Sequence, residues 1–138
     1  MKARLLTLVV LFVSISVMAQ QPRPEQDPIG ENLFPPELVL QHQKEIGLDE
    51  AQKTFVRSEI SKAQGRFTDL QWQLQDAMES LAALLSKSNA DEQQVLAQLE
   101  KVLNVEREIK KLQITLMLRI KNKLSPDQQA RLRQLRKP

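Results

Sequence analysis

Apolar residues recur every three or four positions from Leu48 to Ser86, which is the spacing of one face of a long α-helix. The row consists of Val56, Ile60, Ala63, Phe67, Leu70, Leu74, Ala77, Leu81 and Leu84. Three neighbouring apolar residues widen it: Phe55, Met78 and Leu85. At 1.5 Å per residue, a helix over 50–86 would be about 55 Å long. The pattern therefore predicts an elongated rod.

A second apolar row follows with the same spacing over about Ala90 to Lys123. It consists of Val95, Leu99, Val102, Val105, Ile109, Leu112, Leu116 and Ile120, with Leu96, Leu103 and Met117 beside it. The polar turn over 86–89 is short, so we expect the second helix to fold back antiparallel along the first. Shorter helices are predicted over 35–46 and 127–137.

Three of the predicted helix starts carry the same capping chemistry. In each, a short side chain with an oxygen atom precedes a Gln or Glu by three residues, as in a capping box. The pairs are Asp49 with Gln52, Asn89 with Glu92, and Ser125 with Gln128. Pro126 fits the first turn of the last helix, and Gly47 fits the left-handed residue that ends a helix.

Composition supports an all-α fold in one domain. The chain has 138 residues, no Cys, no Tyr and three Gly, so neither a disulfide framework nor a thiolate metal site is available. The helical domain is predicted over 34–138. The preceding segment, 20–33, is rich in Pro and polar residues without periodicity and is predicted to be a disordered leader.

The first 19 residues have the pattern of a cleaved secretory signal peptide. Lys2 and Arg4 precede an apolar stretch over 5–13, and Val17-Met18-Ala19 provides a cleavage site. The alternative, a membrane anchor, is disfavoured because residues 5–18 are too few to span a membrane comfortably and are interrupted by Ser14 and Ser16. We expect a periplasmic protein, cleaved after Ala19 and without stable membrane insertion.

Charge is distributed unevenly after the predicted cleavage. Residues 105–138 contain ten basic and three acidic residues, whereas residues 20–104 contain eight basic and fourteen acidic residues. A secreted protein with a basic end rarely meets nucleic acid, so we do not expect nucleic acid as a partner. Membrane phosphates, acidic partner surfaces or the chain's own acidic segment are the expected counterparts.

The width of the apolar rows predicts self-association. A two-helix hairpin buries one seam, and the short terminal helices cannot cover what remains along about 50 Å of rod. We therefore expect an elongated homodimer in which long helices pack across a two-fold axis.

Two of the capping boxes also carry a longer motif. Leu48-Asp49-Glu50-Ala51-Gln52 and Leu124-Ser125-Pro126-Asp127-Gln128 both fit Leu-(Thr/Ser/Asp)-x-x-Gln. With the long hairpin between them, they resemble the LTxxQ family, which includes the periplasmic Spy and CpxP proteins and shades into heavy-metal sensors. Asp49 and Ser125 replace the usual Thr, and both are good caps.

The resemblance implies an all-α, cradle-like dimer that holds or refolds unfolded or misfolded periplasmic proteins without ATP. For part of the family it also implies signalling towards a sensor histidine kinase. Metal sensing or modulation of a two-component system is the alternative function. The zinc-responsive relatives use His- and Cys-rich segments, whereas this chain has one His and no Cys.

Candidate chemical sites are few, and no enzyme or cofactor is expected. There is no Gly-rich phosphate loop, no nucleophile with a His and acid partner, and no paired His. A metal could be held by His42 with Glu45, or by Met78 with Met117 across the hairpin. We favour a surface His and two core-filling Met residues, since tight metal sites need several imidazole or thiolate ligands.

The candidate client-binding residues combine aromatic and basic side chains. They are Phe55, Arg66, Trp72, Arg119, Lys121, Lys123, Arg131 and Arg133. Trp72 projects from the side of the helix opposite the apolar row. Burial beneath the 34–46 segment or at a dimer contact is favoured over exposure on a client-binding surface, since an aromatic ring usually finds apolar cover.

Overall fold

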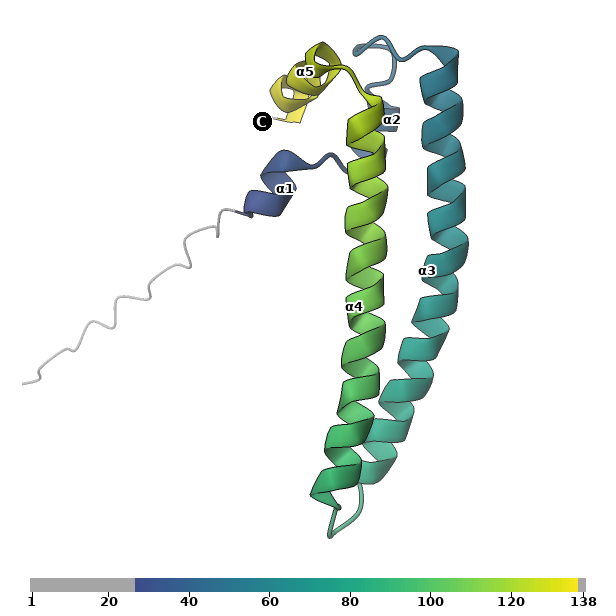
Figure 1. The fold of residues 1–138 in the computed structure, drawn as a ribbon, viewed down its shortest axis with the longest axis vertical. Coiled ribbons are helices and arrows are strands. Elements are labelled where there is room, and N and C mark those ends of the chain that lie inside the picture. Colours follow the sequence, from purple (N-terminus) through teal and green to yellow (C-terminus); the bar gives the residue numbers. More distant parts are fainter. Residues whose placement is uncertain (1–26, 137–138) are drawn as a thin grey trace, which may run out of the picture.

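The computed structural model describes residues 27–136, and every regular element within this range is an α-helix. The helices are α1 (Pro28–Asn32), α2 (Pro36–Gln41), α3 (Glu50–Leu85), α4 (Glu92–Lys123) and α5 (Pro126–Arg136). α3 and α4 run antiparallel and side by side (Figure 1). The predicted all-α hairpin with short flanking helices is confirmed. The predicted signal peptide, residues 20–26 and Lys137 lie outside the described residues.

The two predicted apolar rows form the seam between α3 and α4. Every residue of both rows is buried or half-buried, and Val56, Leu70, Val102 and Ile120 are the most completely covered. Near the turn between the long helices, the side-chain amide of Gln98 donates to the carbonyl oxygen of Ala77 at 2.9 Å. The seam and this hydrogen bond fix how far one helix is shifted along the other.

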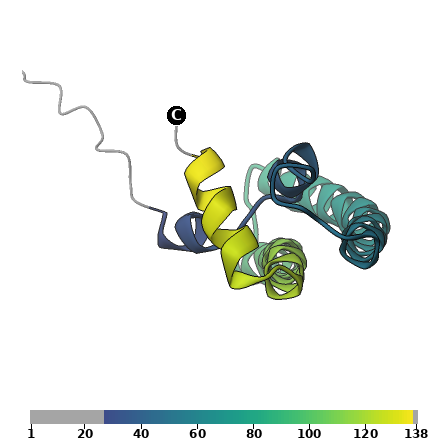
Figure 2. The ribbon, with the colours of Figure 1, turned by 90° about the horizontal axis from the view of Figure 1, so that it is seen from above.

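The main hydrophobic core lies where the chain enters α3 and leaves α4, which we call the closed end of the hairpin. The opposite end, with the turn between α3 and α4, is the tip. At the closed end α2 lies on one side of the hairpin and α5 extends from α4 (Figure 2). The buried core residues are Phe34, Val39, Ile46, Leu48, Val56, Ile120, Leu124 and Leu132. The short helices thus act as a third layer at one end only.

Two of the three predicted capping boxes are confirmed, and both are complete. Asp49 accepts from the backbone N–H of Gln52 at 2.7 Å, while the Gln52 side chain accepts from the N–H of Asp49 at 3.2 Å. Ser125 and Gln128 make the corresponding bonds at 3.1 and 2.9 Å. Gly47 has the predicted left-handed conformation, with φ of 66°.

The third predicted box, Asn89 with Glu92, is wrong. α4 instead begins at Glu92 behind Asp91, whose side chain accepts from the N–H of Gln94 at 2.8 Å. Asp caps a helix as well as Asn does, and its negative charge also complements the helix dipole. The acidic residue two positions further on therefore provides the cap.

The N-terminal segment also differs from expectation. Part of the predicted disordered leader forms α1, in which Pro28 occupies the first turn and Asp27 accepts from the N–H of Ile29 at 3.1 Å. The next helix is shorter than predicted, because α2 ends at Gln41 and a series of turns follows over 42–47.

Candidate functional site

The two Leu-x-x-x-Gln motifs meet at the closed end. The amide of Gln52 donates to Oε1 of Gln128 at 2.8 Å, and the amide of Gln128 donates to Oε1 of Gln52 at 2.9 Å. The same two amides also donate to the carbonyl oxygens of Lys123 and Gly47, at 3.0 and 3.2 Å. We call this arrangement the amide pair. It satisfies the polar groups of two helix starts that are distant in sequence, so the motifs have a structural role.

An ion-pair cluster crosses the hairpin near the closed end. Glu59 is 8% exposed, and its carboxylate accepts from Arg119 Nη1 at 2.9 Å and from Lys62 Nζ at 3.1 Å. The hydrogen bond from Arg119, followed by that from Lys62, lowers the pKa of Glu59 below its ordinary value. The carboxylate is therefore charged at neutral pH, and it ties α3 to α4.

Arg136 holds the N-terminal segment against α5. Its guanidinium donates to the carbonyl oxygens of Gly30, at 2.7 Å, and of Leu33. The same group lies over the ring of Phe34, at 5.1 Å from the ring centroid. Since Phe34 is fully buried, this contact anchors the segment that leads into α2.

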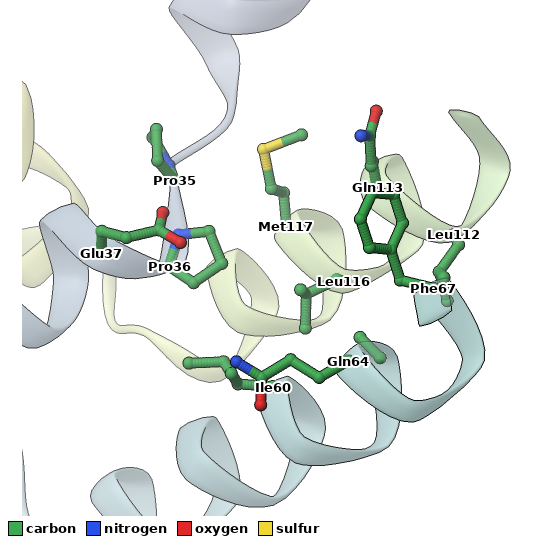
Figure 3. Close-up of a pocket in the computed structure, with 11 residues that line it drawn as sticks. Pro35, Pro36, Glu37, Ile60, Gln64, Phe67, Leu112, Gln113, Leu116 and Met117 are labelled. Carbon is green, nitrogen blue, oxygen red and sulfur yellow. The ribbon is translucent and has the colours of Figure 1, made fainter. Parts of the chain in front are cut away.

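A groove of about 350 Å³ lies beside the start of α2 and between the long helices. Pro35, Pro36 and Glu37 form one side of it, and residues of α3 and α4 form the rest (Figure 3). The lining is mainly apolar and includes Ile60, Phe67, Leu112, Leu116 and Met117. The groove is within the size range of small-ligand sites, but it is open to solvent along its length.

Apolar residues continue from this groove towards the tip along α3. Met78 follows Phe67 by eleven residues and Leu85 follows Met78 by seven, so these side chains lie on the same side of the helix. Met78 is 48% exposed and Leu85 is 57% exposed. The side of α3 that lines the groove therefore carries further apolar residues towards the tip, and they are uncovered there.

The same side of α4 shows the same continuation. Leu96 and Leu103 are seven residues apart, and Met117 of the groove lies two further heptads along the helix. Leu96 is 52% exposed and Leu103 is 40% exposed. We call the surface formed by the groove and the exposed Met78, Leu85, Leu96 and Leu103 the open apolar face.

Trp72 lies outside the open apolar face. It is 63% exposed on α3, and the predicted burial beneath the 34–46 segment is wrong. The reason is geometric: Trp72 points away from the seam, while the short helices pack at the closed end. The other predicted possibility, a dimer contact, stays a prediction.

The remaining candidate client-binding residues do not form one continuous surface. Phe55 and Lys123 come together, with the Lys ammonium 5.1 Å from the ring centroid, and line a shallow hollow with Glu59, the partner of Arg119. Arg133 lies over Phe34 at 5.9 Å. Arg131 donates to Gln134 at 3.2 Å, Lys121 is half-buried and Arg66 is exposed. Several of these basic side chains thus make intramolecular contacts.

The apolar pattern did not predict the groove. Its α2 side is formed by Pro35, Pro36 and Glu37, which in the sequence indicate only the start of a helix. The available signal was the position of Ile60 and Phe67 in one row and of Met117 beside the other. Such residues can line a groove if the short helices that form the third layer do not extend over them.

The metal candidates are only partly assembled. Nδ1 of His42 lies 2.7 Å from Oε1 of Glu45. Met78 and Met117 are far apart, since Ala77 pairs with Gln98 and Met117 lies 19 residues further along α4. Within residues 27–136, no three His, Asp or Glu side chains come close enough together to hold a metal ion. In the same range, no helix has the length and apolar character needed to cross a membrane.

Comparison with known proteins gave one family match. A family model described as heavy-metal resistance matches residues 4–136. Neither the search of curated proteins nor the search of solved structures gave a match.

Proposed function

The chain belongs to the heavy-metal resistance family, and from this premise we propose that it holds unfolded or misfolded proteins on the open apolar face without ATP. The observation that carries the proposal is the open apolar face, in which four large side chains beyond the groove are 40–57% exposed. A cluster of exposed apolar side chains of this kind is typical of sites that bind other proteins.

We place this activity in the periplasm, on the basis of the secretory pattern in residues 1–19. A holding function needs no catalytic residue. Reversible binding is favoured because the apolar side chains are half-exposed and the face is an open surface.

Suppression of aggregation of a chemically denatured model protein, with no ATP, tests this proposal. We expect protection at near-stoichiometric amounts, and at least a severalfold loss of protection in a variant carrying Leu96→Gln and Leu103→Gln. The matched control is Leu118→Gln, because Leu118 is 45% exposed on α4 but lies beside the polar line of Asn104 and Lys111. Equal protection by all three proteins, or no protection by the wild type, would contradict the proposal.

A metal-responsive signalling role is the second candidate. It is favoured by the family match and would couple metal binding to a partner such as a sensor histidine kinase. A metal that binds only the folded state raises the melting temperature. We would measure the melting temperature with zinc, nickel, cobalt and copper, for the wild type and for His42→Ala. A rise that His42→Ala removes would support this role, and unchanged melting with all four metals would count against it.

A further inference from the structure

The two halves of the hairpin carry opposite charge. In the tip half, residues 69–108, there are eight acidic and three basic residues. In the closed half, residues 27–68 with 109–136, there are eight acidic and thirteen basic residues. The described part of the chain is therefore neutral as a whole but polarised along its long axis.

This polarity extends along the edge of the open apolar face on α4. Glu92 precedes Leu96 by four residues and Glu100 follows it by four, so both carboxylates flank the apolar side chains of the tip half. Lys110 follows Leu103 by seven residues and precedes Met117 by seven. Lys121, one turn beyond Met117, continues the same line.

These four charges are available to a partner. Glu92, Glu100 and Lys110 are exposed and Lys121 is half-buried. Among the ion pairs of residues 27–136, none involves any of the four. The edge of the face thus presents acids near the tip and bases near the groove, and none of these four side chains forms an ion pair within residues 27–136.

We propose that the open apolar face binds an amphipathic segment in one orientation, with acidic residues of the segment beside Lys110 and Lys121 and basic residues beside Glu92 and Glu100. This inference rests on the proposed function and names the class of segment that the face selects. From Glu92 to Lys121 the edge is about 44 Å long at 1.5 Å per residue, enough for a helical segment of more than 20 residues. Apolar contacts supply attraction, and the charges decide direction.

Site-specific crosslinking can test the orientation, because the chain has no Cys. The probe is a synthetic 24-residue amphipathic peptide with glutamates in one half, lysines in the other and a thiol-reactive group at the glutamate end. Two single-Cys proteins report its position. Gln64→Cys lies in the groove of the closed half, and Ser88→Cys lies in the turn at the tip.

We expect the glutamate end to couple to Gln64→Cys about fivefold more than to Ser88→Cys at low salt, as several weak exposed ion pairs would give. The preference should reverse in a variant with Glu92→Lys, Glu100→Lys, Lys110→Glu and Lys121→Glu, which keeps the net charge. If circular dichroism shows that this variant is unfolded, Glu100→Lys with Lys110→Glu is the milder exchange. A control peptide with interleaved charges should couple to both sites equally.

Equal coupling of the polarised peptide, or coupling that the charge exchange does not alter, would overturn the inference while leaving the holding function intact. If two copies of the chain crosslink to each other and the peptide does not couple, a second copy of the chain occupies the open apolar face and the inference is overturned. Absence of peptide coupling would overturn it as well. The aggregation assay run in parallel then distinguishes this result from failure of the proposed function, which would also remove client protection.

Discussion

The closed end and the tip half of the hairpin are built from the same two helices but bury their apolar residues to different extents. At the closed end Phe34, Val39, Val56, Ile120 and Leu132 are all fully buried. In the tip half the seam is mostly half-buried, and its best covered residues are Leu70 and Val102, at 2% and 3% exposed. The α3–α4 seam is common to both regions, whereas α2 and α5 are present only at the closed end.

The difference shows that two helices alone cannot cover their own apolar surface. Each helix presents a stripe wider than the single seam it shares with its partner, and a third layer is needed for the remainder. At the closed end the short helices provide that layer. In the tip half the remainder becomes the open apolar face, so stability should depend on the closed end and binding on the tip half.

Among the substitutions that test this difference, Phe34→Ala should cause the largest loss in the free energy of unfolding. The side chain is fully buried in the third layer, and removing a buried Phe costs about 3–5 kcal/mol. Urea unfolding should reveal this loss. Trp72→Ala, at a position 63% exposed, is the matched aromatic control and should change the free energy of unfolding by less than about 0.5 kcal/mol. Similar losses in both variants would remove the distinction between the two regions.

Gln52→Ala and Gln128→Ala should each destabilise the fold by about 1–3 kcal/mol, because each leaves a partner's hydrogen-bonding groups unsatisfied at the amide pair. The double variant should lose less than the sum, since either substitution already breaks the pair. Denaturant unfolding of the wild type, the two single variants and the double variant measures this coupling. Gln75→Ala, whose amide bonds only to Glu79 on the α3 surface, is the control. Strict additivity would mean that the two amides act independently.

Glu59 should make stability depend on pH. Its pKa is lowered in the folded state from an ordinary value of 4.5, so its stabilisation is present above that pH and is lost as the pH falls through the folded value. Glu59→Gln should cost about 1–2 kcal/mol at pH 7 and show a smaller loss of stability than the wild type below pH 4.5. Chemical unfolding from pH 7 to 3 tests this.

The matched control for Glu59 is Glu108→Gln. That carboxylate lies 3.1 Å from Lys111 but is about half exposed, so its ion pair should contribute less than about 0.5 kcal/mol. If both variants show the same pH profile, the ion-pair cluster around Glu59 has no special role in stability.

Leu85→Gln should have the smallest effect. The residue is 57% exposed at the tip, so the substitution should change the free energy of unfolding by less than about 0.5 kcal/mol. The same experiment on Leu132→Gln, a fully buried position in α5, should give a loss of several kcal/mol. A large loss for Leu85→Gln would mean that the tip half is covered in solution, as in the expected homodimer.

Periodicity alone predicted most of the hairpin. The rows that include Val56 and Val102 became the seam because residues with helical spacing must share a face. The capping boxes at Asp49 and Ser125 formed because their chemistry is local. The predicted cap at Asn89 was wrong for a related reason. Asp91 is an equally good capping residue two positions later, and the local sequence does not determine which of the two begins the helix.

The site was harder to predict because it depends on where the third layer ends. Nothing near Pro35 indicates that α2 stops at Gln41 and leaves a groove beside it. Burial of Trp72 beneath the 34–46 segment was predicted because aromatic rings are usually covered, yet that segment packs only at the closed end. The amide pair joins two motifs recognised separately, and only the tertiary structure brings them together.

The amide pair also constrains the order in which contacts form during folding. Gln52 and Gln128 are 76 residues apart, so the start of the first long helix lacks its partner until the last helix has been made. A contact of such sequence separation forms late, after the local seam. A chain that ends at Lys123 should therefore keep its seam but fray at the start of α3. The eleven residues of α5 therefore provide the last contact to form among the described helices.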